Sequence, residues 1–429
     1  MWLKRLGYSV LLLLSVPLGW LGSVSGFFAL AFITDMIPLL LLSGVLVSVL
    51  LTGWLSWSAC HGLFIRPLLQ RGLPVIVTGG TLFVVGVITS VHVFQPMAIT
   101  YVPKESTFET VYWDLPTGSR LAYIHIPAEG TAHPTPVILL HGGPGASSNF
   151  TLQPEDQRLA SAGFNVYLYD QVGSGLSERL DDITQYTVDR HVADLEAIRQ
   201  EIDAESMILV GGSWGGTLAA HYLAAHPERV EKVVFSSPGA IWTPAFAEGE
   251  IETGSSGNAS SIVAEFATLR WVVAYALQQI NPTAAQNLVS DREMSAFFQQ
   301  IVGHVIASDV ADCDTQDGVR ELPTVSVIPQ GFGYYANMMT VASMSQTADP
   351  RPVLVNSKTS VLILRGECDR IRPEVHQEYR EIFTYSTLFV VDDVGHAVNR
   401  SPQYADILSA FLLEQPLLLE PYQSEIALP

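Results

Sequence analysis

Charged side chains are almost missing from the first hundred residues of this 429-residue chain. Only Lys4, Arg5, Asp35, Arg66 and Arg71 occur there. That segment carries a formal charge of +3 and the remainder carries −23, which together give the net charge of −20. So abrupt a change in composition predicts two physically different modules that meet near residue 100.

Basic residues are scarce beyond that point, since the whole chain has 22 Lys and Arg against 42 Asp and Glu. An acidic surface repels phosphate groups, so we expect no nucleic-acid partner. The acidic surplus favours either cationic substrates or, more simply, a solvated surface that keeps the protein soluble.

Cysteine is scarce as well, with only Cys60, Cys313 and Cys368. None of them has the spacing of metal ligands, so we expect no metal and no cofactor. Cys313 and Cys368 can form a disulfide if they lie outside the cytosol.

Three long uncharged runs occupy the charge-poor segment, at residues 8–34, 36–58 and 73–94, with His92 as the only ionisable residue of the third. Each has the roughly 20 residues needed to cross a bilayer core. None shows the polar face at a period of about 3.6 that a soluble helix has. We therefore expect three transmembrane helices in an anchor spanning residues 1–98. The runs lack the embedded charges that mark transport paths, so we expect no transport role.

The few charges of this segment predict an orientation, because basic loops stay in the cytoplasm. Two basic residues precede the first run and two lie between the second and the third. The N-terminus and the loop at 59–72 are then inside, and everything after Phe94 is outside. A second interpretation makes the first run a cleaved signal peptide, with small residues at 22–26, and leaves the same final location.

Short apolar runs alternate with amphipathic ones after residue 100, and Asp189–Ala204 has the periodicity of a helix. The predicted strands are residues 108–115, 120–126, 136–140, 164–169, 207–210, 232–235, 361–364 and 387–391. This alternation predicts a mostly parallel sheet with helices on both faces.

Residues 241–350 interrupt the alternation with a polar loop, helix-like runs near 262–277 and 294–305, and an aromatic stretch. We expect a helical lid that divides the core into residues 99–240 and 351–429. An insertion there lies over the carboxyl ends of the strands, where open α/β sheets bind ligands.

A Gly-x-Ser-x-Gly turn at Gly211–Gly215 joins the 207–210 strand to a helix-like run. Such a turn exposes its serine, here Ser213, at the top of a sheet. His396 follows the last predicted strand and is the candidate base, and Asp369 follows the strand before it and is the candidate acid. Ser, Asp, His is the chain order of this type of hydrolase.

These residue types predict acyl transfer. His396 takes the Ser213 proton and returns it to the leaving group, while Asp369 fixes the histidine tautomer. The N–H groups of Trp214 and Gly143 are the expected oxyanion donors.

Other candidates compete with these residues. Glu367 is the alternative to Asp369 as the acid. His141 is expected to be a structural turn residue, and His221, on the helix after the elbow, is expected to pack.

Three motifs together resemble the proline iminopeptidase branch of the α/β-hydrolases: His141–Gly145, Asp170–Ser177 and Gly211–Gly216. The resemblance covers roughly residues 105–415. It implies an α/β-hydrolase fold with a helical lid and metal-free hydrolysis at an N-terminal residue, often proline.

The same family holds the substrate's free amine with lid glutamates, one of them just before an Asn-x-Tyr-Phe-like stretch. The nearest counterpart here begins at Gly331, which has no side chain. Glu265, Tyr334 and Tyr335 are our candidate substrate-binding residues. The other acidic candidates in the lid are Glu248, Glu250 and Glu252.

The sequence therefore predicts a membrane-anchored serine hydrolase whose substrate is a peptide. The alternatives are an esterase or lipase on the same fold, acting on small esters, and a non-catalytic binding module that keeps the fold. An intact set of Ser213, Asp369 and His396 disfavours the last.

Overall fold

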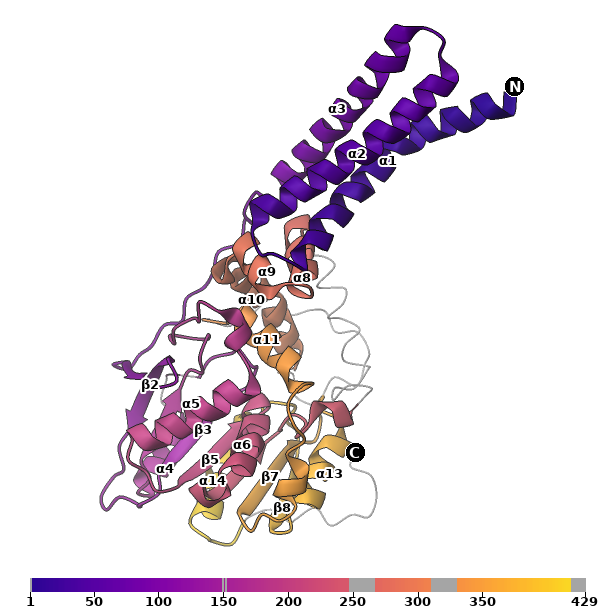
Figure 1. Ribbon diagram of the computed structural model, residues 1–429. Coiled ribbons are helices and arrows are strands. Elements are labelled where there is room, and N and C mark those ends of the chain that lie inside the picture. The colour runs from indigo at the N-terminus through magenta and orange to yellow at the C-terminus, as the bar shows by residue number, and fades with distance from the viewer. Residues whose placement is uncertain (1, 149, 151–152, 247–266, 310–329, 418–429) are drawn as a thin grey trace. The chain divides into compact units, whose positions relative to one another are not determined.

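A computed structural model describes residues 2–148, 150, 153–246, 267–309 and 330–417. The chain divides into two compact units. The first comprises residues 1–99 and 267–293, and the second comprises residues 100–266 and 294–429 (Figure 1).

The first unit contains three long helices, α1 (Trp2–Ala31), α2 (Ile37–Leu63) and α3 (Pro67–His92). All three are long and apolar enough to cross a membrane, which confirms the three predicted apolar helices. Helices α1 and α2 approach closely where residues are small, since a Cβ on Gly44 would lie 2.7 Å from the Ser23 carbonyl oxygen. Small residues allow this packing in the absence of a hydrophobic driving force between apolar helices.

Two short helices of the inserted segment, α8 (Leu269–Gln278) and α9 (Pro282–Leu288), also belong to the first unit. The Arg270 guanidinium donates to the Val93 carbonyl at 2.6 Å and pairs with Glu293 at 2.7 Å. Asn281 Nδ2 donates to the Ala31 carbonyl at 2.9 Å. These bonds satisfy carbonyls at the ends of apolar helices. The expected lid at 241–350 is thus shared between the two units.

The second unit is built on an eight-stranded sheet with the order β1-β2-β4-β3-β5-β6-β7-β8. Its strands are β1 (Val111–Asp114), β2 (Arg120–Ile126), β3 (Val137–Leu140), β4 (Val166–Tyr169), β5 (Met207–Gly212), β6 (Val230–Ser236), β7 (Ser360–Gly366) and β8 (Ser386–Val391). The ladders of β1 with β2 and of β2 with β4 are antiparallel, and those from β4 to β8 are parallel. All eight strands expected from the sequence are present.

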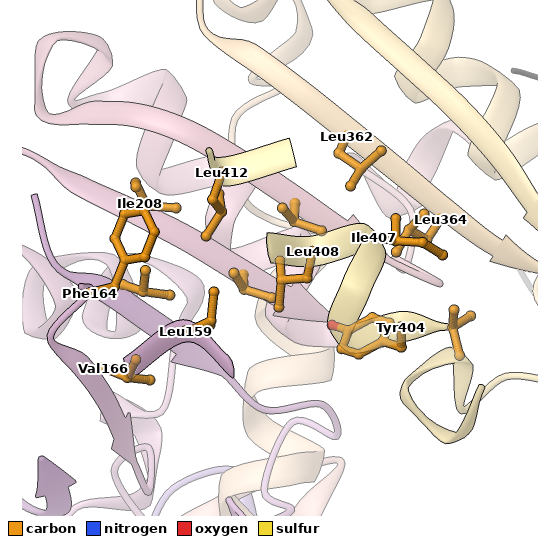
Figure 2. Packing of buried hydrophobic residues seen from close by; sticks show 14 of the residues in the cluster. Leu159, Phe164, Val166, Ile208, Leu362, Leu364, Tyr404, Ile407, Leu408 and Leu412 are labelled. Carbon is orange, nitrogen blue, oxygen red and sulfur yellow. The ribbon is translucent and has the colours of Figure 1, made fainter. Parts of the chain in front are cut away.

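Helices α4 (Pro154–Ser161) and α14 (Tyr404–Leu412) contribute to the main hydrophobic core. Figure 2 shows Leu159 of α4 and Leu408 of α14 in this cluster with Ile208 of the sheet. Helices α5 (Val188–Glu201), α6 (Trp214–Ala225) and α13 (Pro373–Ile382) complete the α/β layers.

In the described parts of the segment between β6 and β7, α10 (Asp291–Asp309), α11 (Tyr334–Met344) and α12 (Arg351–Leu354) follow α8 and α9. Helix α11 packs against α5 within the second unit. Val188 N–H donates to Ser343 Oγ at 3.0 Å, and His191 Nε2 lies 3.1 Å from Thr340 Oγ1.

Replacing Leu408 with alanine tests the core. Its side chain is 0% exposed, so the change removes buried methyl groups and leaves a cavity. We expect the free energy of unfolding to fall by about 2–5 kcal/mol. Leu413→Ala, which truncates a residue that is 37% exposed, is the matched control and should change it far less. Denaturant titration of the detergent-solubilised chain measures both, and equal losses would contradict the packing described.

Candidate active site

Ser213 lies at the junction between β5 and α6 in a backbone conformation with φ +52° and ψ −122°. Few non-glycine residues adopt positive φ, and those that do cluster at functional sites. Hydrogen bonds hold the turn in place, because Ser213 N–H donates to Ser236 O and the Ser213 carbonyl accepts from Gly216 and Gly239. The structure thus confirms the predicted strand, sharp turn and helix.

Glycines flank Ser213 because the turn leaves no room for side chains. A Cβ on Gly211 would lie 2.3 Å from the Gly215 carbonyl oxygen, and a Cβ on Gly215 would lie 2.1 Å from the Leu140 carbonyl oxygen. Real Cβ atoms do not approach backbone oxygens so closely. The motif is therefore a steric requirement of the elbow.

His396 and Asp369 come from the loops after β8 and β7 and meet in a hydrogen bond of 2.8 Å between Nδ1 and Oδ1. Asp369 Oδ1 also accepts from the Ile371 N–H at 3.0 Å. Burial disfavours the ionised carboxyl, but bonds from His376 and His396 outweigh it and hold the pKa of Asp369 well below its usual value. A permanent carboxylate at this point fixes the orientation of the His396 ring.

His376 on α13 is a residue that the sequence analysis missed. Its Nε2 lies 3.3 Å from Asp369 Oδ2, and its side chain is completely buried. Burial lowers the pKa of His376, although Asp369 opposes the shift. No motif marks this histidine, because it reaches Asp369 only through the packing of α13.

Glu367, the alternative acid, is exposed and accepts a hydrogen bond from the Asp393 N–H at 3.0 Å. The carboxyl joined to His396 is therefore that of Asp369. Cys368 lies between the two acids and is disulfide-bonded, whereas Cys60 is free; Cys313 lies outside the described residues.

Ser213 and His396 line one cavity of about 320 Å³. Its other walls come from Leu139, Leu140, His141, Gly142, Ser147, Ser148, Gln153, Glu155, Asp156, Leu168, Val210, Gly212, Ser236, Val398, Asn399, Tyr404 and Leu408. Ser213 and His396 therefore lie on the wall of the same cavity. Two carboxyl groups on α4, those of Glu155 and Asp156, face it, and the sequence analysis did not identify either.

The expected oxyanion donors lie around the same serine. Trp214 is the first residue of α6, so its N–H belongs to the helix end that has no intrahelical acceptor. Gly142 lies directly against Ser213, since a Cβ there would be 3.1 Å from Ser213 Cβ. The N–H of Gly143 belongs to the peptide that follows Gly142. Gly143 itself has φ +121°, which glycine tolerates without a steric penalty.

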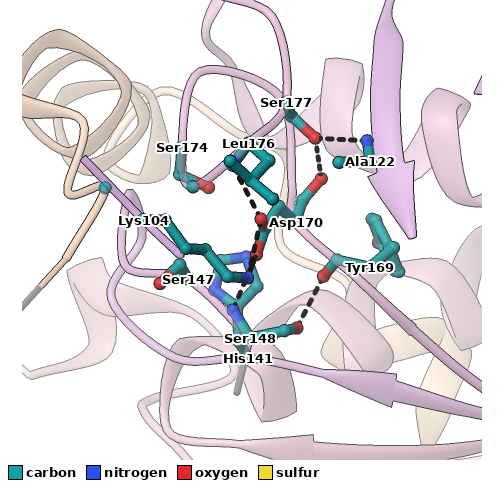
Figure 3. Close-up of polar contacts among 12 residues, drawn as sticks. Lys104, Ala122, His141, Ser147, Ser148, Tyr169, Asp170, Ser174, Leu176 and Ser177 are labelled. Carbon is teal, nitrogen blue, oxygen red and sulfur yellow. Dashed lines mark hydrogen bonds and ion pairs between the residues drawn. The ribbon is translucent and has the colours of Figure 1, made fainter. Parts of the chain in front are cut away.

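A buried ion pair supports this glycine turn (Figure 3). Lys104 Nζ lies 2.7 and 2.8 Å from the two Asp170 oxygens, and Ser148 N–H and Leu176 N–H donate to the same carboxylate. Burial lowers the pKa of Lys104, although Asp170 opposes the shift. The sequence analysis recognised Asp170 only as part of a motif and missed Lys104 altogether.

His141 is a structural residue of the turn, as expected. Its Nε2 accepts from the Gln171 N–H at 3.0 Å, so the ring proton is on Nδ1, 2.8 Å from the Gly142 carbonyl. Burial lowers the pKa of His141 to about 4, which keeps the ring neutral. His221 is also structural, because its Nε2 donates to the Ile241 carbonyl at 3.0 Å.

Gly331 and Gly333 pack against the loop that follows Asp170. Gly331 has φ +69°, and a Cβ there would lie 2.7 Å from Gly175 Cα. A Cβ on Gly333 would lie 1.9 Å from the Gly173 carbonyl oxygen. The backbone leaves no space for a glutamate at Gly331. The departure from the resembled pattern is therefore built into the fold.

The two candidate substrate-binding residues that the structure describes do not line the cavity. Tyr334 and Tyr335 are 1% and 0% exposed and pack against each other at the start of α11. Neither belongs to the lining of the cavity at Ser213. Glu265, Glu248, Glu250 and Glu252 lie outside the described residues. A role in substrate binding stays a prediction for all of them.

Comparison with known proteins adds independent findings. A family model described as the alpha/beta hydrolase fold matches residues 135–399. The proline iminopeptidase of Heyndrickxia coagulans is 41% identical over 122 residues, which are 28% of this chain and 41% of that protein. That of Lactobacillus delbrueckii subsp. bulgaricus is 40% identical over 126 residues, 29% and 42% of the two chains. The match thus spans less than half the length of these relatives.

Among solved structures, the bromoperoxidase from Bacillus anthracis is similar with a TM-score of 0.50 and 20% identity. The alignment covers 71% of this chain and 100% of that one. At this identity the likeness concerns the fold alone.

Replacing Gly215 with alanine tests the elbow. The added methyl group would collide with the Leu140 carbonyl, so we expect the chain to lose folded protein or to unfold at a much lower temperature. Gly212→Ala is the matched control, because its Cβ meets nothing nearer than Ser236 O at 3.8 Å. Yield of monodisperse protein and melting temperature are the measurements, and equal tolerance of both variants would contradict the described turn.

Proposed function

Because the chain belongs to the α/β-hydrolase family, we propose that it is a membrane-anchored serine hydrolase that releases N-terminal residues from peptides. The observation that carries the proposal is the placement of Ser213 and His396 on one cavity, with His396 bonded to the buried Asp369. Nucleophile, base and orienting acid are the three groups that this chemistry requires.

In the proposed reaction, Ser213 Oγ attacks the carbonyl carbon of the scissile bond while His396 Nε2 takes the hydroxyl proton. The Nδ1 proton of His396 stays in its bond to Asp369, which stabilises the imidazolium. The protonated Nε2 then protonates the leaving amine, and an acyl-enzyme forms. A water molecule, deprotonated by His396, releases the acyl group and regenerates Ser213.

The negative charge of each tetrahedral intermediate needs hydrogen-bond donors that are already oriented. We assign this role to the N–H groups of Trp214 and Gly143. The N-terminus of α6 adds a favourable dipole beneath Ser213. The Lys104–Asp170 pair keeps the glycine turn in position, because Asp170 is bonded to Ser148 just beyond it.

The proposed substrate class is supported by the similarity to proline iminopeptidases, which extends over less than a third of this chain. The chemistry of acyl transfer does not by itself distinguish amides from esters. The alternative function is therefore that of a carboxylesterase on the same fold.

Membrane anchoring is supported by the three apolar helices. We propose that they hold the hydrolase unit outside the cytoplasm, on the basis of Arg66 in the loop between α2 and α3 and Arg71 near the start of α3. The disulfide at Cys368 supports the same side, because disulfides persist in oxidising compartments.

Replacing Asp369 with asparagine tests the assignment of the acid. The His396 tautomer is then no longer fixed, and we expect kcat to fall about 10⁴-fold, with a comparable or larger loss for Ser213→Ala. Glu367→Gln is the matched control and should keep near-normal kcat, since Glu367 is exposed and bonded elsewhere. Steady-state kinetics of purified protein give the comparison. Full activity of Ser213→Ala would refute the mechanism.

A substrate panel tests the peptidase activity. We expect turnover of prolyl and other aminoacyl fluorogenic amides that carry a free amine, and slower turnover of their N-acetylated forms. Short-chain acyl esters report the intrinsic reactivity of Ser213. If the protein hydrolyses the esters but none of the free-amine amides, its activity is that of an esterase and the peptidase proposal is wrong.

Reporter fusions test the topology. A reporter joined after residue 100 should be active only outside the cytoplasm, and one inserted in the 63–66 loop should be active only inside. An alkaline phosphatase and a fluorescent protein that folds in the cytoplasm provide opposite readouts. The reverse pattern at both sites would contradict the proposed orientation.

A further inference from the structure

The cavity at Ser213 has an acidic wall formed by the first turn of α4. Glu155 and Asp156 are its carboxyl groups, and Asp156 is 1% exposed. Asp156 Oδ2 accepts from the Gln153 N–H at 3.0 Å, which caps the helix. Asp156 Oδ1 is buried and has no hydrogen-bond partner among the described residues.

A buried acceptor without a partner is costly, and a buried carboxylate without a cation costs more. Burial raises the pKa of Asp156 to about 7 and also raises that of Glu155. No lysine or arginine belongs to the described lining of this cavity. Burial thus disfavours ionisation of both carboxyl groups, and no lysine or arginine of the described lining compensates the charge that they carry once ionised.

The lid does not supply an equivalent group in the described residues. The position that resembles the family's amine-binding glutamate is Gly331, where the backbone of Gly175 excludes a side chain. An aminopeptidase still has to bind the ammonium group of its substrate. The only carboxyl groups of the described structure that share a cavity with Ser213 are those on α4.

We propose that Asp156, assisted by Glu155, forms the subsite that binds the protonated N-terminal amine of the substrate. Asp156 Oδ1 accepts one N–H of the ammonium group, and Glu155 supplies a second negative charge. The inference rests on the proposed function, because it names the group that would give that hydrolase its specificity. It transfers amine recognition from the lid to a helix of the core.

Binding is tested without turnover in the full-length, detergent-solubilised Ser213→Ala protein at pH 7.5. Calorimetric titration compares prolinamide, which is cationic, with N-acetylprolinamide, which is neutral. We expect the cation to bind at least about tenfold more tightly, because a hydrogen bond between charged groups is stronger than one between neutral groups. Adding Asp156→Asn should remove that preference.

The asparagine keeps an acceptor oxygen for the Gln153 N–H, so α4 should remain capped. Asp182→Asn is the matched control, because Asp182 caps a short helix through the Thr184 N–H and is exposed. It should leave the preference for the cation unchanged. Melting temperatures of all variants show whether each is folded.

The result that overturns the subsite is equal binding of both ligands by the Ser213→Ala protein, or an unchanged preference after Asp156→Asn. Equal weakening of both ligands would also overturn it and make Asp156 a structural acid only. A preserved cation preference in a protein that hydrolyses no substrate would instead overturn the proposed function and support the subsite. Cleavage of free-amine amides at undiminished KM by the Asp156→Asn enzyme would overturn the subsite and support the proposed function.

Discussion

The buried carboxylate of Asp170 joins three parts of the chain that the active site needs. It accepts from Lys104, which follows the apolar helices, from Ser148 beyond the glycine turn, and from Leu176 in its own loop. Removing the partner of such a buried charge typically costs about 3–5 kcal/mol. The glycine turn is therefore held by electrostatics within the core, and helix α11 adds two bonds to it, from the Gly333 N–H to the Gly145 carbonyl and from Asn337 Nδ2 to the Pro144 carbonyl.

Steric crowding holds the backbone turn at Ser213 in position. The positive φ of Ser213 is maintained because Gly211, Gly215 and the Leu140 carbonyl leave one arrangement of the backbone. Strain of this kind persists only where the surrounding structure determines it fully. The parallel strands β3, β5 and β6 provide that surrounding. Strands β7 and β8 continue the parallel sheet, so the loops that carry Asp369 and His396 lie at the same edge of it.

Local patterns predicted much of this arrangement. Apolar runs indicated the three long helices and all eight strands, and the Gly-x-Ser-x-Gly turn indicated the elbow. The choice of Asp369 over Glu367 rested on family resemblance, and the structure adds a physical reason, since only Asp369 is buried beside His396. The lid was predicted less well. Its α8 and α9 helices belong with the apolar helices because Arg270 and Asn281 bond to carbonyls at their ends, a pairing across more than 170 residues that no local pattern encodes.

The sequence by itself determined the two modules, the order of strands along the chain and the candidates for the reacting groups, because composition, periodicity and turn chemistry act over short distances. Tertiary structure decided which charges lie in the cavity. No sequence pattern marked Asp156, whereas Tyr334 and Tyr335 were candidate contacts. Packing buried the tyrosines in the core and placed Asp156 among the residues that line the cavity at Ser213. Side-chain exposure depends on which elements meet, and only the assembled sheet and its helices bring those elements together.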